Sequence, residues 1–519
     1  MARKTLTLLS VFVILSLLLA CGGTVAPTEA PKPTEAAKPT EVPKPAGPTG
    51  AIVIAIGGDP STLDPQAADD GNERAVNDNI YETLIARDPK TMELVPSLAE
   101  SWKELDATTW EVKLHQGIKF HNGEPFNAEA AAFSINRVIN PEYKSEQISF
   151  FSTITEAKAI DDTTLQVITI GPDPTLPARL YWLKMVPPQY ATDADFGTKP
   201  VGTGPYKFVE WVRDDHVTLE ANPDYWGATK PTIAKVTIRP IKEEVTRLAA
   251  LKAGEVDLVR GLIPEYVSEV PKALSTPGLE FPWLRLNTLV GPLTDKRLRQ
   301  AINYALNKEE LAQSLYSGYA VPADGQILTP GHFGYNPNVK AYPFDLEKAK
   351  QLIQEAGYNG EEIEFVGEAG RWLKDKELIE AVAQQLREAG LNIKVNIVEW
   401  SQWLDLLFAG ADKAPVIQFS AHSNELLDAD RTLSAMFEST GSQTAYKNPQ
   451  FDQLVDAART ETDLAKRADE YHQAVQIAYD DAAIGFLLNL KDIYGMTQRV
   501  EWTPRLDGKM IVLEMKLTE

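Results

Sequence analysis

The stretch PVGTGPYKFVEWVRDDHVTLEANPDYWGATKPTIAKVTIRPIKEEVTRLAALKAGEVDLV, residues 200–259, determines the expected fold. It opens with Gly202, Gly204 and Pro205, which predict a tight bend because glycine can adopt positive φ and proline fixes its own φ. Residues 206–211 have the composition of a β-strand, and two aspartates then turn the chain back. The first half of the stretch therefore predicts two strands joined by a turn.

The second half of the stretch adds a loop, a helix and two more strands. Asn222-Pro223-Asp224 is typical of a turn and leaves Tyr225 and Trp226 in a loop. Residues 243–253 carry apolar side chains at a roughly helical period, and Gly254 is a natural residue for the helix end. The whole stretch predicts strand, turn, strand, loop, strand, helix and strand.

Three motifs of this stretch are VGTGPYKF, NPDYWG and RLAALKAGEVDLV, and two more matching segments lie at 96–138 and 284–323. In order and spacing, these segments resemble the extracellular solute-binding proteins of family 5, the oligopeptide-, dipeptide- and nickel-binding type that serves ABC importers. The resemblance covers about residue 50 to the C-terminus. It implies an α/β protein with mixed α+β lobes, built as a two-lobed clamp of the class II periplasmic-binding type with an extra third domain. Such a clamp closes on its ligand.

The resemblance also implies discontinuous domains, because the family's chain returns to the first lobe at its C-terminus. The expected boundaries are 51–94, 203–284 and 496–519 for domain I, 95–202 for domain II, and 285–495 for domain III. The last strands of domain I are expected at 501–502 and 510–516. A chain of 519 residues is long enough for two or three lobes.

Within domain III, polar residues ahead of apolar stripes predict the starts of helices. Asp295, Asn307 and Ser401 are each expected to cap a helix N-terminus, and residues 374–389 are expected to form a helix. Residues 391–397 alternate apolar and polar side chains, which is the period of a strand. Strands that alternate with helices predict right-handed crossovers and a parallel sheet in this domain.

The composition is that of a soluble globular protein with a strongly acidic surface. Hydrophobic residues make up 44% of the chain, charged residues 24%, and the formal net charge is −22. Nucleic acid and anionic lipid surfaces are not expected as partners, because both need a basic face. Solubility of an exported protein explains the acidic surface, and some acidic residues could also favour cationic ligands.

The first 20 residues predict a signal peptide. Arg3 and Lys4 form a basic start, and the apolar segment 6–19 is short for a membrane-spanning helix, which needs about 20 apolar residues. The segment ends at Cys21 in a sequence that resembles a bacterial lipobox. This implies cleavage before Cys21 and lipidation of its thiol. The alternative is a plain signal peptide followed by a chance cysteine.

Residues 21–50 predict the lipid anchor followed by an extended tether. Three consecutive hexads, PTEAPK, PTEAAK and PTEVPK, alternate Glu with Lys and contain no apolar side chain large enough to seed a core. Proline-rich chain extends by about 3.1 Å per residue, so the tether would hold the body away from the membrane. The expected location is extracytoplasmic, anchored by lipid to the bacterial cell membrane, at the cell surface or in the periplasm.

Sequence motifs typical of catalysis do not occur in the chain. The six histidines include no pair three to five residues apart, and HExxH, CxxC, GxSxG and P-loop patterns are absent. Neither an enzyme nor a metal site nor a cofactor is therefore expected. Transport energy must come from another polypeptide, and the resemblance implies permease and ATPase subunits of an ABC importer as partners.

The first candidate for ligand contact is the segment GEAGRWLKDKELIEAVAQQL, residues 367–386. It resembles the family's glycine-arginine-aromatic segment ahead of a helix, and it places Arg371 and Trp372 at the carboxyl end of a strand, where open α/β lobes bind ligands. An arginine at this position can hold a carboxylate bidentately. The alternative is an internal ion pair between Arg371 and an acidic neighbour.

The second candidate is residues 417–434, which follow a further predicted strand. Peptide-binding relatives carry a tryptophan, two residues and an aspartate here, and the aspartate meets the α-ammonium of the peptide. This chain has His422 in place of the tryptophan and Glu425 in place of the aspartate. Asn424, one of the two residues between them, is a further candidate for ligand contact. Glutamate keeps the charge with a longer reach, whereas histidine replaces a broad stacking face with a smaller polar one. The departure puts a standard peptide pocket in doubt.

Trp403 and Trp182 are candidates for an aromatic surface that could contact a peptide side chain or a sugar face. The alternative for both is packing in the core.

Taken with the resemblance, these residues predict a lipid-anchored binding protein of an ABC importer for peptides or similar small polar solutes. An oligosaccharide or a chelated metal is the alternative cargo, because relatives differ in cargo on one scaffold. A surface sensor or adhesin with the same fold is the third possibility. If Glu425 meets an ammonium and Arg371 a carboxylate, the ligand is a short zwitterion.

Overall fold

Residues 200–259 fold into the elements that their sequence predicts. They form β8 (Tyr206–Val212), β9 (His216–Ala221), β10 (Ile233–Pro240), α4 (Glu244–Ala253) and β11 (Leu258–Arg260). Gly254 ends α4 in the left-handed conformation at φ 74°, and its N–H donates to the carbonyls of Ala250 and Leu251.

The bend before β8 needs glycine for a reason other than the predicted one. Gly202 and Gly204 are not among the residues with positive φ. Instead, the backbone passes close to the end of the first helix, where Gly204 N–H donates to Ile80 O at 2.8 Å. A Cβ atom on Gly202 would lie 2.1 Å from Ile80 O, and one on Gly204 would lie 2.6 Å from it. Close backbone approach therefore excludes a side chain at both positions.

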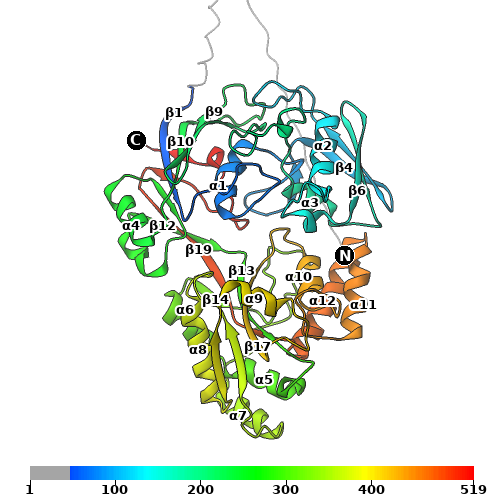
Figure 1. Cartoon of the computed structure of the whole chain (residues 1–519), viewed down its shortest axis with the longest axis vertical. Coiled ribbons are helices and arrows are strands. Elements are labelled where there is room, and N and C mark those ends of the chain that lie inside the picture. The colour runs from blue at the N-terminus through cyan, green and yellow to red at the C-terminus, as the bar shows by residue number, and fades with distance from the viewer. Residues whose placement is uncertain (1–46, 519) are drawn as a thin grey trace, which may run out of the picture. The chain divides into compact units, whose positions relative to one another are not determined.

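The computed structural model describes residues 47–518 (Figure 1). The predicted signal peptide, Cys21 and nearly all of the tether lie outside the described residues. Between residues 47 and 518, no helix is both long and apolar enough to span a membrane.

The first lobe, residues 47–279 and 488–518, is built on two sheets. The larger has eight strands: seven follow the order β12-β19-β11-β1-β10-β9-β8, and β14 (Ala320–Pro322), which belongs to the chain segment of the second lobe, pairs with β19. Within this sheet β1 runs parallel to both β10 and β11. The smaller is an antiparallel sheet in the order β4-β5-β7-β6. The remaining elements of this lobe are β1 (Thr49–Ile56), α1 (Gly71–Ile80), β2 (Ile85–Arg87), β3 (Leu94–Pro96), β4 (Ala99–Asp106), β5 (Thr109–Leu114), α2 (Ala128–Ile139), β6 (Ile154–Asp161), β7 (Thr164–Thr169), α3 (Leu176–Trp182), β12 (Lys272–Pro277), β19 (Leu488–Met496), β20 (Val500–Glu501) and β21 (Lys516–Leu517).

The C-terminal segment differs from the sequence prediction. The strand predicted at 501–502 forms one residue earlier, as β20, which ends at Glu501. The prediction of a strand over 510–516 is wrong, because residues 512–514 form a 3₁₀ turn. Met510, Val512 and Met515 instead bury their side chains in the core beneath the eight-stranded sheet. The apolar residues of this segment are therefore buried in an irregular stretch of chain and do not form a long strand.

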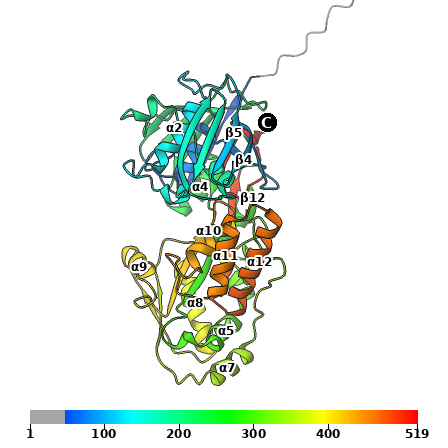
Figure 2. The same cartoon turned by 90° about the vertical axis from the view of Figure 1, so that its right-hand side faces the viewer.

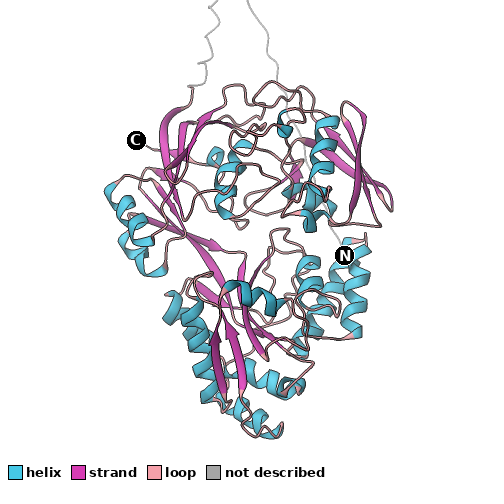
Figure 3. Cartoon of the chain, in the orientation of Figure 1, coloured by secondary structure: helices cyan, strands magenta, loops and turns pink. Residues whose placement is uncertain are grey.

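The second lobe, residues 280–487, contains a five-stranded sheet in the order β16-β15-β17-β13-β18 (Figures 2 and 3). β15 runs parallel to β16 and β17, as predicted, whereas β13 is antiparallel to both of its neighbours. Its elements are β13 (Glu280–Leu286), α5 (Lys296–Ala305), α6 (Lys308–Tyr316), β14 (Ala320–Pro322), α7 (Leu346–Glu355), β15 (Ile363–Gly367), α8 (Asp375–Glu388), β16 (Ile393–Ile397), α9 (Trp400–Leu407), β17 (Ile417–Ser423), α10 (Ala429–Met436), α11 (Pro449–Thr460), α12 (Leu464–Asp480) and β18 (Ile484–Phe486).

The helix starts of the second lobe follow two of the three predicted caps. The side chains of Asp295 and Asn307 accept backbone N–H groups at the starts of α5 and α6. Ser401 is not a cap, because α9 begins one residue earlier at Trp400 with Glu399 as its N-cap residue. Glu399 makes no side-chain capping bond, so the start of α9 has no polar cap that a sequence pattern could identify.

Two segments connect the lobes. β12 leads into β13 through residues 278–279, and β19 pairs with β14 at one end and with β12 and β11 at the other. The N–H of Gly278 donates to Leu490 O at 2.9 Å, which joins the two segments at the crossing point. Figure 1 shows β19 running between the first lobe and the second lobe.

Candidate ligand-binding cleft

A cavity of about 560 Å³ lies between the lobes. Polar residues of both lobes line it, among them Asp70, Arg74, Arg247, Arg260, Glu280, Arg371, Ser423 and Glu425. An adjoining cavity of about 700 Å³ shares Arg247, Gly261, Glu280 and Arg371 with it, and extends to Asp492 and the loop before α8. Both lobes thus contribute charged side chains to a connected, polar cleft, as a site for a small polar solute requires.

Arg371 lies on a loop that is held in place by Asp375. The carboxylate of Asp375 accepts the N–H groups of Gly370, Arg371 and Trp372, each at 2.9 Å. The Arg371 side chain is exposed, lines both cavities and forms no ion pair within residues 47–518. The guanidinium lies near the Trp400 ring, with 5.7 Å between the guanidinium carbon and the ring centroid. The internal ion pair that the sequence left open is therefore not formed here.

The tryptophans near this loop form a cluster that supports it. Trp372 contacts Trp400, Trp403 and Phe419 edge-on, and Trp372 also lines the larger cavity. Trp403 is 2% exposed and donates its Nε1–H to Phe419 O at 2.9 Å. Trp403 thus packs in the core and does not line either cavity, whereas Trp182 is buried but lines the smaller one.

His422 and Asn424 hold the loop after β17 and do not line the two cavities. His422 Nε2 lies 3.0 Å from Thr432 Oγ1, and Asn424 donates to Thr432 Oγ1 at 2.8 Å and to Asp428 O at 2.7 Å. Burial and the nearby Arg431 guanidinium hold the pKa of His422 well below its usual range. The expected ligand contacts of these two residues are replaced by bonds to the first turn of α10.

Glu425 does line the smaller cavity, but its charge is already compensated. One oxygen accepts the Ser423 hydroxyl at 2.7 Å, and the other pairs with the Arg431 guanidinium. Arg431 also donates to Ser423 O at 3.0 Å and lies 4.3 Å from the centroid of the Phe150 ring in the first lobe. An ammonium group at Glu425 would therefore have to share the carboxylate with an arginine.

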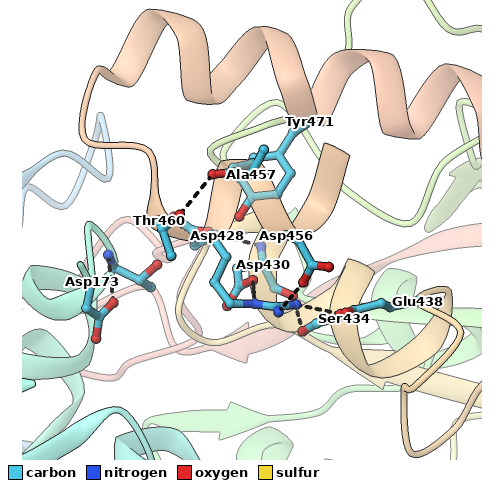
Figure 4. A network of polar contacts seen from close by, with 12 residues as sticks. Asp173, Asp428, Asp430, Ser434, Glu438, Asp456, Ala457, Thr460 and Tyr471 are labelled. Carbon is cyan, nitrogen blue, oxygen red and sulfur yellow. Dashed lines mark hydrogen bonds and ion pairs between the residues drawn. The ribbon is translucent and has the colours of Figure 1, made fainter. Parts of the chain in front are cut away.

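Charged residues behind the loop fix its position (Figure 4). Asp428 accepts two hydrogen bonds from the Arg467 guanidinium at 2.7 and 2.8 Å, and Arg467 reaches Thr175 of the first lobe at 3.0 Å. Arg459 joins Asp430 to Glu438, with its Nε 3.1 Å from Asp430. Bidentate and networked pairs of this kind restrain a loop more than isolated pairs do.

Three further arginines of the cleft were missed at the sequence level. Arg74 in α1 donates to Asp69 O at 2.7 Å, Arg247 in α4 to Ile241 O at 2.7 Å, and Arg260 in β11 to Gly71 O at 2.5 Å. Backbone carbonyls position these guanidinium groups without neutralising them. The three residues are isolated in the sequence, so only the packing of α1, α4 and β11 brings them together.

Comparison with known proteins identifies the family of this chain. Residues 93–444 match the family described as bacterial extracellular solute-binding proteins, family 5 Middle. The glutathione-binding protein GsiB of Pectobacterium atrosepticum is 30% identical over 454 residues, which cover 84% of this chain and 88% of that protein. The Escherichia coli K12 protein of the same name is 28% identical, covering 83% and 87%.

A solved structure is similar to this chain along nearly its whole length. The periplasmic binding protein DppA of Helicobacter pylori, in complex with the peptide STSA, superposes with a TM-score of 0.73 at 27% identity, covering 91% of this chain and 98% of that one. The family match spans more than half of the chain, and the relatives match along most of their length. The chain therefore belongs to the bacterial extracellular solute-binding proteins of family 5.

Proposed function

We propose that this solute-binding protein captures a short, carboxylate-bearing peptide or peptide-like solute outside the cytoplasm and delivers it to the permease of an ABC importer. The observation that carries the proposal is the group of four cleft arginines, Arg74, Arg247, Arg260 and Arg371. None of the four forms an ion pair within residues 47–518, although the chain as a whole has a net charge of −22. Guanidinium groups suit the bidentate recognition of carboxylates.

The relatives support the same class of cargo. GsiB is named a glutathione-binding protein, and the DppA structure is described as an ABC transporter-associated protein in complex with a peptide. Glutathione is itself a small peptide with two carboxylates and a free amine. It is therefore the first ligand to test.

This chain binds and releases the cargo, and the importer's ATPase subunits supply the energy. The cargo is delivered without chemical change. Lipidation of Cys21 would keep the protein at the membrane, close to the permease, and the tether would let the lobes reach it.

The function is tested by calorimetry with the purified body, residues 47–519, which retains every described element. Reduced glutathione, a set of unmodified tripeptides and a set of neutral oligosaccharides are titrated separately. Binding of glutathione or a peptide that weakens as salt is raised supports the proposal, because salt screens charge recognition. Binding of a neutral oligosaccharide alone, without salt dependence, would overturn it in favour of a carbohydrate.

A further inference from the structure

Two carboxylates occupy the crossing point between the lobes. Glu280 begins β13 on one connecting segment, and Asp492 lies in β19 on the other (Figure 1). The two segments are hydrogen-bonded there through Gly278 and Leu490, and a Cβ on Gly278 would lie 3.2 Å from Asp492 Oδ1. Both carboxylates line the larger cavity, and Glu280 lines the smaller one as well.

These carboxylates are without partners among residues 47–518, although both are only partly exposed. Three other carboxylates that line the cleft are compensated. Asp69 forms an ion pair with Lys184 at 2.9 Å, and Glu425 forms one with Arg431. Asp375 accepts hydrogen bonds from three backbone N–H groups. Leaving a carboxylate unpaired in a partly buried site costs free energy that a bound cation can offset.

Arginines of both lobes act electrostatically on the two carboxylates. Burial and the charge of Asp492 raise the pKa of Glu280 to about 7, and Arg371 opposes the rise. Burial also raises the pKa of Asp492, where Arg260 and Arg74 oppose the rise. Positive charge from the second lobe thus acts on Glu280, and positive charge from the first lobe acts on Asp492.

We propose that Glu280 and Asp492 form the subsite for an ammonium group of the cargo, with Arg371 and Arg260 placed beside it to receive carboxylates. The inference rests on the proposed function and deepens it, because it defines the cargo as a zwitterion with its amine at the crossing point of the lobes. An ammonium has three N–H donors, enough to serve both carboxylates at once. Glu425 is left with Arg431 and is not the main partner of the amine.

A proton is expected to leave when the ammonium binds. In the free protein Glu280 is partly protonated near neutral pH, because its pKa is raised to about 7. A bound ammonium favours the ionised carboxylate and so lowers that pKa. Binding below about pH 7 therefore releases a proton, and affinity for an amine-bearing ligand rises with pH up to this value.

The test compares free amines with blocked amines. Reduced glutathione and the unmodified tripeptides are titrated by calorimetry against their N-acetylated forms, with wild type, Glu280→Gln, Asp492→Asn and the control Glu347→Gln, an exposed residue on α7. Glu280→Gln and Asp492→Asn are expected to lose at least about tenfold in affinity for free amines, with no comparable loss for acetylated forms. Proton release, measured in buffers of different ionisation enthalpy, should disappear in Glu280→Gln.

The outcomes separate this inference from the proposed function. Peptides that bind equally well with free and acetylated amines would retain the function and overturn the ammonium subsite. If no peptide binds, a thermal-shift screen of small non-peptide zwitterions and amines decides the subsite. Stabilisation that is lost in Glu280→Gln supports it, and the absence of any stabilisation by an amine overturns it.

Discussion

Arg87 and Leu426 belong to different lobes, and the Arg87 guanidinium donates to the Leu426 carbonyl at 2.6 Å. The Leu426 side chain is 2% exposed and packs in the apolar core around the four-stranded sheet of the first lobe. It directly follows Glu425, which lines the ligand cavity. One short loop of the second lobe therefore contacts both the cavity and the core of the first lobe, so we expect it to couple cargo binding to lobe contact.

Leu426→Ala is expected to weaken contact between the lobes while leaving each lobe folded. Truncation of a buried leucine typically costs about 2–5 kcal/mol, and here the lost packing is between lobes. Solution scattering should show a larger radius of gyration for the ligand-free variant than for wild type. The matched control is Leu105→Ala, whose side chain is 44% exposed on β4. Equal radii for both variants and wild type would contradict the coupling role.

Arg371→Ala is expected to reduce affinity for a carboxylate-bearing ligand by about tenfold or more, because it removes an unpaired guanidinium from the cleft. Arg371→Lys should lose less, since it keeps the charge but not the bidentate geometry. Calorimetry at two salt concentrations measures both effects. A twofold or smaller change in Arg371→Ala would show that Arg371 does not contact the ligand.

Glu425 and Arg431 are expected to be energetically coupled in the free protein. A double-mutant cycle with Glu425→Gln and Arg431→Gln should give an interaction energy of about 1–3 kcal/mol in urea unfolding, because the pair is mostly shielded from solvent. Additive effects of the two substitutions would mean that the pair is not maintained in solution.

Cys21→Ser is expected to release the protein into the soluble fraction of the producing bacterium. The residue is the chain's single cysteine, and in the predicted lipoprotein it carries the lipid. Fractionation with immunodetection measures the change. Retention on membranes at the wild-type level would rule out the anchor at this residue.

The local structure of the fold follows from short sequence signals, whereas the cleft does not. Asp295 and Asn307 cap helices as predicted, because a cap depends on residues within one turn of it. Arg371 follows from a local segment, but Arg74, Arg247, Arg260 and the Glu280–Asp492 pair come together only through contacts between segments far apart in the chain. No local pattern distinguishes these residues from surface charges.

The resemblance to the family also had a limit that the structure explains. Glu425 lines the cavity, but the family motif contains no information on Arg431, which compensates that carboxylate. A single substitution in a family motif thus cannot be interpreted without the residues that face it across the fold. Trp403 is a similar case, since its aromatic type allowed either a ligand surface or core packing, and the structure places it in the core.

Glu82 is expected to make the protein less stable as pH rises from about 4.5 to about 7. It accepts hydrogen bonds from Tyr225 at 2.7 Å and Trp226 at 2.8 Å, in the NPDYWG loop, and burial raises its pKa to about 7. A carboxyl whose pKa is higher in the folded than in the unfolded state favours folding when protonated, and this contribution is lost as pH rises through the folded value. The difference from the ordinary value of 4.5 corresponds to a loss of folding free energy on the order of 3 kcal/mol.

Urea unfolding at pH 5 and pH 7.5 measures this effect. The free energy of unfolding should depend less on pH for Glu82→Gln than for wild type or the exposed control Glu347→Gln. Because glutamine cannot ionise, a Glu82→Gln variant with the wild-type pH dependence would show that this carboxyl is not titrating in the folded protein over that range.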